Sequence, residues 1–486
     1  MKKSILTLRT SLLSALIVGS SAMNLEAAKL MDVIQNATIS GFAFGRIQTI
    51  HGRDGNGTRY QLRFKPTITT GEVYGWSGSA GIFFSKGSGT PDSNNTNADI
   101  SGSRGDMHIS LVDRFSIGDF YITYQAKEQL GTNTLIRAGQ KSPTTPYNDT
   151  NLDRALGIFL ENSDLSALNI GFQWWDTWIG DDMFISPNLT GSNYSNSSTG
   201  IGNDVFMLSL TSGKDFTEKT GFGYQVWYSY VEGLFDYMTF ADISYTAKFG
   251  SQSLGILAQV SATGLNKKPT FLSNGSLEFN TLFQNTNYDY ARNRGMYNIR
   301  LDYRYNFTQS QSAATEDSDA PAPAPTNVGF IGVAVGFAGS FGDGYGTLID
   351  NTGGLKIGGN IWNNFAGTEA NGFGILGTGS FRNSSITAPY LKVEFGYKKF
   401  GLALDVVYVD TTHFYYLKKA GATGNLNGAT GNLYGPNNKI AVANFVETSL
   451  SATYKFTDSI NMGAYYGYLI GNPSMGRFRF QVNYVF

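Results

Sequence analysis

Residues 297–307 read Tyr-Asn-Ile-Arg-Leu-Asp-Tyr-Arg-Tyr-Asn-Phe, in which apolar and polar side chains alternate without a break. Successive side chains of a β-strand point to opposite faces, so this segment has one apolar face and one charged face. A closed barrel in a membrane accommodates both, because lipid covers the outer face, water wets the inner face and no strand edge is left unpaired. The stretch therefore predicts a membrane-spanning strand.

The same period of two recurs along the chain and defines about eighteen candidate strands. They lie at 37–48, 59–69, 73–85, 110–125, 133–141, 156–162, 166–179, 204–212, 221–232, 236–248, 253–263, 293–307, 328–338, 389–398, 400–410, 440–456, 459–470 and 477–486. An even number of strands returns both ends of the barrel domain to one side of the membrane. The sequence thus predicts an all-β fold, a transmembrane antiparallel β-barrel over 37–486, with long extracellular loops.

Connections between these strands alternate between short turns and long polar segments. The long ones, predicted to be extracellular, are 86–106, 180–203, 264–292, 339–388 and 411–439. One segment, 308–327, is long yet falls on the periplasmic side, and it carries an Ala-Pro repeat. It is either a linker or a sign that the strand count is off by one nearby.

Composition excludes several classes of protein. Charged residues make up 15% of the 486 residues, whereas soluble domains carry about 25%. A formal net charge of −1 argues against a nucleic-acid partner, and the absence of cysteine excludes disulfides, thiolate metal sites and thiol nucleophiles. The aromatic content of 14% is typical of a barrel with aromatic girdles.

The two ends of the chain indicate export to the bacterial outer membrane. Residues 1–22 have the basic start, apolar stretch and small-residue cleavage site of a signal peptide, and 23–36 is expected to be a short periplasmic segment. The alternating strand that ends in Phe486 resembles the signal that outer-membrane barrels present to the barrel-assembly machinery. Outer-membrane lipid and lipopolysaccharide are then the expected surroundings.

Charged residues predicted to face inward, or to lie in the loop after the fifth strand, are the candidates for a pore constriction. A charge on the lipid face costs about 2 to 4 kcal/mol at the membrane midplane, which favours the inward assignment. Two acids four residues apart in a loop, opposite basic walls, would set up a transverse field. For any single residue, a solvated wall position without a specific role is the alternative. The candidates are Arg59, Arg63, Lys65, Arg137, Lys141, Asp149, Asp153, Arg154, Arg300, Asp302 and Arg304.

The loop after the fifth strand also offers oxygen ligands. Asp149 and Asp153 are of the type that Ca²⁺ prefers, although no complete EF-hand pattern is present. A structural Ca²⁺ at these two residues is the cofactor expected from the sequence. An exposed loop capped by Asn and Asp is the alternative.

A series of short motifs follows in a fixed order along the first part of the chain. They are Arg59–Phe64, the Thr70-Gly71-Glu72 turn, Gly75-Trp76-Ser77, Ala80-Gly81, Asp119–Tyr124, Ala138–Lys141, Thr145-Pro146 and Asp149, with Leu25–Ile34 before the first strand. Together they resemble the major outer membrane protein porins of Campylobacter and Helicobacter type. The resemblance implies a homotrimeric, mildly cation-selective porin with calcium at the constriction, and it carries Asp149 first and Asp153 second as ligands. The segments 308–327 and 339–388 do not align with this pattern.

The predicted function is a water-filled channel for passive diffusion of small hydrophilic solutes and ions. An enzyme is not expected, because the three histidines, His51, His108 and His413, have no Ser or Asp in a catalytic spacing beside them. Two alternatives stay open. One is a surface adhesin or receptor barrel without an open pore, and the other is a dedicated solute channel in which Trp175 and Trp227 stack on a ring-shaped solute.

Overall fold

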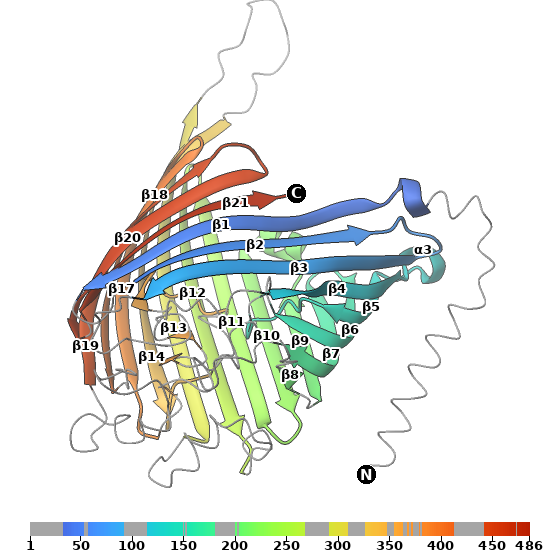
Figure 1. The fold of residues 1–486 in the computed structure, drawn as a ribbon, viewed down its shortest axis with the longest axis horizontal. Coiled ribbons are helices and arrows are strands. Elements are labelled where there is room, and N and C mark those ends of the chain that lie inside the picture. The colour runs from blue at the N-terminus through green and yellow to red at the C-terminus, as the bar shows by residue number, and fades with distance from the viewer. Residues whose placement is uncertain are drawn as a thin grey trace, which may run out of the picture.

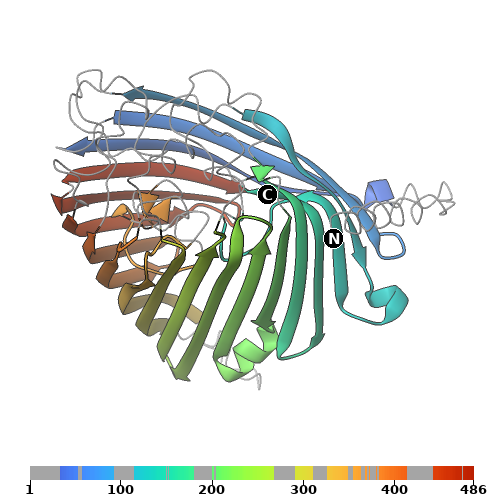
Figure 2. The same ribbon diagram turned by 90° about the horizontal axis from the view of Figure 1, so that it is seen from below.

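Eighteen long strands of the described residues close into an antiparallel β-barrel in the computed structural model (Figures 1 and 2). The structure describes residues 33–52, 57–91, 114–148, 150, 153–179, 200–201, 204–267, 291–309, 326–347, 354–362, 367–368, 371–372, 379, 382–412, 442–472 and 474–486. No helix among these residues is long and apolar enough to cross a membrane.

The barrel strands follow the chain, each pairing with the next. They are β1 (Thr38–Gly52), β2 (Gly57–Thr69), β3 (Trp76–Pro91), β4 (Arg114–Gln125), β5 (Thr134–Lys141), β6 (Arg154–Leu165), β7 (Leu168–Ile179), β9 (Val205–Ser212), β10 (Phe222–Val231), β11 (Phe235–Phe249), β12 (Gln252–Leu265), β13 (Asn293–Gln309), β14 (Thr326–Gly342), β17 (Ile386–Tyr397), β18 (Phe400–Thr412), β19 (Val442–Lys455), β20 (Ile460–Asn472) and β21 (Met475–Val485). Short additions are β8 (Gly200–Ile201), which pairs with β7, the separate pair β15 (Gly367–Thr368) and β16 (Asn371–Gly372), and the helices α3 (Lys127–Leu130) and α4 (Lys214–Thr220).

The first and last strands close the barrel. Strand β1 pairs antiparallel with β21 from Phe42 opposite Val485 to Gly52 opposite Met475. The start of β1 and the end of β21 therefore lie at the same end of the barrel. This agrees with the even number of strands expected from the sequence.

The alternation in the sequence sets the two faces of the wall. In β13, Ile299 and Leu301 are 51% and 53% exposed on the outside, whereas Asn298 between β12 and β14 is fully buried on the inside. The same rule holds in β2, where Leu62 and Phe64 are exposed and Lys65 is buried. An apolar exterior and a polar interior are thus built by one local pattern.

Each of the expected strands has a counterpart, and the differences lie at the ends. Strand β3 begins at Trp76, not at residue 73, because Tyr74 and Gly75 have positive φ angles of 52° and 81° and form a turn. Strands β13 and β14 are direct antiparallel neighbours up to Gln309 opposite Thr326. The suspected miscount near 308–327 is therefore wrong, and both ends of this segment lie at the end of the barrel that carries the short turns.

The interior of the barrel contains a cluster of buried apolar side chains. A barrel filled with water alone would not contain such a cluster. Inward side chains of neighbouring strands, among them Trp175 and Phe240, pack with residues that come from two connecting segments. We name residues 142–148 the first inner segment and residues 354–362 the second inner segment. Tyr147 belongs to the first, and Ile361 and Trp362 belong to the second. These two segments occupy the interior and position the candidate site.

Candidate pore constriction inside the barrel

The first inner segment is fastened at its base by one carboxylate. Asp119 on β4 accepts a hydrogen bond from the backbone N–H of Ser142 at 3.2 Å and one from Thr67 Oγ1 at 2.9 Å. The Nζ of Lys65 lies 3.4 Å from Asp119 Oδ2 and also donates to Ser142 Oγ. Lys65 thus joins the wall of the barrel to the start of the segment.

The tip of the first inner segment is fixed by Tyr147, which is fully buried. Its hydroxyl group lies 3.1 Å from the carbonyl oxygen of Met238 and 3.3 Å from that of Trp227. Within the segment, Asn148 donates to the carbonyl of Pro143 at 3.1 Å. The segment therefore spans the interior from β4 to β10 and β11 as a hydrogen-bonded unit.

The second inner segment rests on the first and on the opposite strands. The backbone N–H of Gly354 donates to the carbonyl of Pro146 at 2.6 Å, which joins the two segments directly. Gln259 on β12 donates to the carbonyl of Gly354 at 2.9 Å and accepts from the backbone N–H of Lys356 at 2.8 Å. The two segments together thus form one structure across the barrel.

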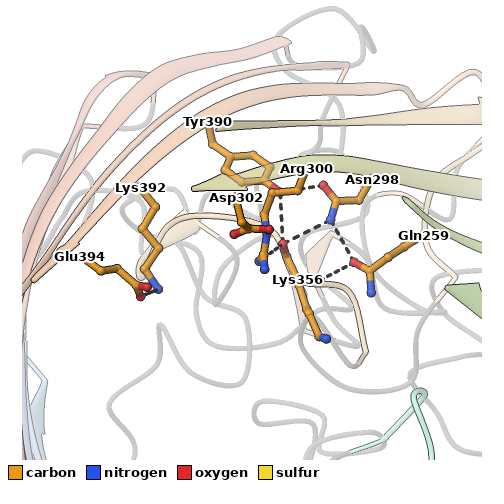
Figure 3. Close-up of polar contacts among 8 residues, drawn as sticks. All are labelled: Gln259, Asn298, Arg300, Asp302, Lys356, Tyr390, Lys392 and Glu394. Carbon is orange, nitrogen blue, oxygen red and sulfur yellow. Dashed lines mark hydrogen bonds and ion pairs between the residues drawn. The ribbon is translucent and has the colours of Figure 1, made fainter. Parts of the chain in front are cut away.

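The carbonyl oxygen of Lys356 is the centre of a polar cluster from three strands (Figure 3). It accepts hydrogen bonds from Asn298 Nδ2 at 3.2 Å, from a guanidinium nitrogen of Arg300 at 3.3 Å and from the hydroxyl of Tyr390 at 3.1 Å. Tyr390 also donates to Asn298 Oδ1 at 2.8 Å. Backbone atoms of Lys356 are therefore held on several sides.

The side chain of Lys356 is exposed and extends away from this cluster (Figure 3). Its ammonium has no hydrogen-bond or ion-pair partner among the residues that the structure describes. The neighbouring charges are paired, Arg300 with Asp302 at 2.9 Å and Lys392 with Glu394 at 2.6 Å. Among the described residues, Lys356 is thus a positive charge without a partner in this part of the interior.

The end of the second inner segment is held by two carboxylates of the wall. Glu447 on β19 accepts hydrogen bonds from the backbone N–H groups of Asn360, Ile361 and Trp362 at 2.6 to 3.1 Å. Asp405 on β18 accepts one from the backbone N–H of Gly359 at 3.2 Å. Gly359 has a φ of +98°, which a residue with a side chain rarely adopts, and this turn aims the N–H groups at the wall.

Strands β1, β2 and β21 contribute basic groups to the interior. The guanidinium groups of Arg46 and Arg63 lie 4.5 Å and 5.6 Å from the ring centre of Phe44. Arg46 also donates to Gln481 at 2.6 Å, and Arg477 donates to Gln48 at 2.6 Å. These contacts hold the guanidinium groups against the wall.

The sequence candidates do not meet at one point. Arg300 and Asp302 pair within β13, and Arg137 pairs with Glu161 at 3.4 Å. The ammonium of Lys141 lies 4.6 Å from the ring centre of Phe159, and the guanidinium of Arg304 lies 3.5 Å from that of Phe330. At the start of β6, Asp153 and Arg154 are buried, and Arg154 donates to the carbonyl of Ile117 at 2.7 Å. Asp149 and the side chain of Arg59 lie outside the described residues.

A calcium site is not assembled by the described part of the chain. It contains no group of three or more His, Asp or Glu that could hold a metal ion. Of the two acids expected to bind calcium, it describes Asp153 alone, which is 1% exposed. The tryptophans considered for stacking on a solute are covered, since Trp175 and Trp227 are 0% and 8% exposed.

Sequence reasoning missed the residues that build the second inner segment. Asp405 and Glu447 are carboxylates near the middle of β18 and β19 at inward positions, which is a signal that could have marked them. Lys356 gave no such signal, because its neighbours Leu355, Ile357 and Gly358 have no strand period.

The barrel defines the class of fold, that of the eighteen-stranded outer-membrane porins. Among solved structures of Pseudomonas aeruginosa proteins, OccK3 (OpdO) is 12% identical with a TM-score of 0.53, and the alignment covers 96% of this chain and 99% of that one. OprD is 10% identical with a TM-score of 0.51, covering 93% and 96%. OccK2 (OpdF), solved in complex with glucuronate, is 10% identical with a TM-score of 0.54, covering 93% and 97%.

Comparisons at the level of sequence identify no relatives. No family model matches the chain, and no curated protein matches it. The resemblance to the Campylobacter and Helicobacter type of major outer membrane protein therefore stays a prediction. At about a tenth identity, the similarity to the Pseudomonas structures shows the fold.

Proposed function

We propose that this protein is a porin of the bacterial outer membrane, which lets small hydrophilic solutes and ions diffuse through its interior. The observation that carries the proposal is the closed barrel with an apolar exterior and a charged interior, into which two ordered segments fold. Lipid matches the exterior and water the charged interior. The two inner segments would then form the constriction.

Conductance in planar lipid bilayers tests this function. Insertion of the purified barrel should give stable, ohmic single-channel steps. A barrel that inserts but conducts nothing would contradict the proposal and favour a surface adhesin or receptor. No catalytic activity is part of the proposal.

Mild cation selectivity is the finer part of the proposal, with Asp149 as its determinant. A carboxylate at a constriction raises the local concentration of cations. Replacing Asp149 with Asn should lower the ratio of cation to anion permeability, measured as a reversal potential in a salt gradient. Unchanged selectivity in Asp149→Asn would argue against a role for this residue.

A structural Ca²⁺ held by Asp149 and Asp153 and assembly as a homotrimer are also proposals, which rest on the resemblance noted above. Contacts with lipopolysaccharide and entry through the barrel-assembly machinery belong with them. The position of Phe486 supports the last point. Its backbone pairs with Gly41 at 2.9 and 3.1 Å, and its ring lies on the outer face at 6.0 Å from that of Phe64.

A channel dedicated to particular solutes is the second candidate, and Lys356 favours it. Its ammonium is exposed, unpaired among the described residues and carried on a fixed backbone. Such a group can orient an anionic group on a passing solute. The solved structure of OccK2 (OpdF) in complex with glucuronate shows that a barrel of similar fold binds a sugar acid.

A further inference from the structure

The second inner segment is held at its end, residues 359–362, by two wall carboxylates and by hydrogen bonds of 2.9 and 3.2 Å from Asn360 Nδ2 to Ser449 Oγ and Ser451 Oγ. Within the described chain, its backbone makes one hydrogen bond to another backbone group outside it, from Gly354 to Pro146. The four N–H groups of residues 359–362 donate instead to Asp405 and Glu447. This half of the segment is therefore fastened by side chains that can take up a proton.

Glu447 is the stronger of the two attachments. Its side chain is fully buried, and its two oxygen atoms accept from three successive N–H groups at 2.6 to 3.1 Å. Among the described residues it makes no ion pair. Hydrogen bonds to an ionised acceptor are about twice as strong as neutral ones, so the charge on Glu447 contributes directly to holding the segment.

Protonation changes what this site can do. An ionised carboxylate only accepts hydrogen bonds, whereas a carboxylic acid carries one O–H donor. The protonated side chain of Glu447 faces the same three N–H donors. It has fewer positions that accept a hydrogen bond, and it no longer carries a negative charge. A buried N–H group without an acceptor is unfavourable, which favours departure of these residues from the wall.

The charged groups of the surrounding strands decide how strongly the ionised carboxylates are favoured, and Lys392 is the cross-strand partner of Asp405. On β17, Lys392 is paired with Glu394, and on β18 stands the second carboxylate, Asp405. On β20, the ring of Tyr465 faces Arg477 of β21, whose guanidinium lies 5.9 Å from the ring centre and donates to Gln48. Farther along the wall lies the Arg300–Asp302 ion pair of β13, and the segment itself carries the exposed Lys356.

We propose that the second inner segment is an acid-releasable part of the constriction, held in place by ionised Glu447 and Asp405 and freed when they take up protons. Release would free residues 359–362, Trp362 among them, and widen the path through the barrel, while Lys356 stays bonded to Asn298, Arg300 and Tyr390. The inference rests on the proposed channel activity, because it describes how that channel would respond to acid.

Single-channel recording against pH tests the proposal with two variants. The wild-type conductance should rise reversibly as the pH falls from about 7 to about 3, which passes through the ordinary pKa values of about 4 for Asp and Glu. Glu447→Gln keeps the shape of the side chain without its charge, so its conductance at neutral pH should match that of the wild type in acid, with loss of the pH response. Glu394→Gln is the control, since Glu394 bonds Lys392 and not the segment, and it should retain the response.

A cross-link separates movement of the segment from a simple change of charge. The chain has no cysteine, and an ideal Cβ at Gly358 lies 3.1 Å from Cβ of Tyr390 on β17. Oxidised Gly358→Cys/Tyr390→Cys should lose the acid response, and a reducing agent should restore it. An acid response that persists in the oxidised double variant overturns the proposal.

The results also separate this inference from the proposed function. A wild-type barrel without conductance steps contradicts the porin itself. Steps that are unchanged by acid, or a Glu447→Gln channel that behaves as the wild type at every pH, overturn the acid-releasable segment and leave the porin standing.

Discussion

Single residues in this barrel act through positions that remote strands define. Lys356 is held by its carbonyl oxygen, which accepts from Asn298, Arg300 and Tyr390, and not by its side chain. Tyr147 is held by its hydroxyl, which meets the carbonyls of β10 and β11. The ammonium group of Lys356 is therefore available to interact with ions. The hydroxyl group of Tyr147, in contrast, is used to hold the first inner segment in place.

Removal of the Lys356 charge should make the channel more cation-selective. In Lys356→Gln the backbone contacts remain, so the reversal potential in a salt gradient should shift toward cations without a loss of folded protein. The shift should shrink between about 0.1 M and about 1 M salt, because the screening length falls from about 10 Å to about 3 Å.

Lys214→Gln is the matched control for this substitution. Lys214 stands on α4 and pairs with Glu218 at 3.8 Å, far along the chain from the inner segments. Its removal should leave selectivity unchanged. Equal shifts in both variants would show that net charge alone, and not the place of Lys356, determines the effect.

Loss of the Tyr147 hydroxyl should destabilise the barrel by about 1 to 2 kcal/mol, because the first inner segment loses the buried hydrogen bond that fixes its tip to β10 and β11. The free energy of unfolding of Tyr147→Phe, measured in urea on barrels refolded in lipid vesicles, would give this value. Tyr408→Phe, at a side chain that is 39% exposed on the outside, should change it by less than about 0.5 kcal/mol.

At the scale of elements, strands and inner segments follow different rules. The strand Asn293–Gln309 could be predicted from its sequence, because alternation with a period of two is a property of the segment itself and does not depend on other parts of the chain. The second inner segment was not, since its place depends on strands β12, β13, β17, β18 and β19. For Trp175, the sequence pattern could indicate which face of the barrel wall the side chain is on. It could not indicate that other residues bury this side chain.

A small residue on β14 leaves room for the cluster that holds the second inner segment. A Cβ added to Gly336 would lie 2.1 Å from Cζ of Tyr390, so Gly336→Val must displace that ring. Tyr390 would then lose its hydrogen bond to the carbonyl of Lys356. We expect altered single-channel conductance and more current noise at neutral pH.

Gly332→Val is a close control for Gly336→Val. Gly332 lies on the same face of β14, two positions away on that face with Ala334 between, but a Cβ there meets no atom closer than 3.7 Å. This variant should conduct as quietly as the wild type. Equal noise in both variants would mean that the added bulk in β14, and not the displaced tyrosine, is responsible.

At the scale of the whole molecule, low charge and many aromatic residues follow from the architecture. A wall one strand thick exposes every second side chain to the outside, as Leu301 and Tyr303 illustrate, so apolar residues are spread over the entire sequence. On the inner face of the described strands, several charges are paired, as in Lys65 with Asp119, Arg300 with Asp302 and Lys392 with Glu394. What the composition did not reveal is the apolar core within the barrel, because its members look the same in the sequence as residues of the outer wall.

The hydrogen bond from Gly354 to Pro146 links parts of the chain that are encoded far apart. Surface loops usually diverge quickly and independently among homologues. These two segments do not have that freedom, since a change of length or direction in one removes the support of the other. Among homologues, the two segments should therefore change together. A new loop grafted into this barrel would likewise require that both segments be exchanged.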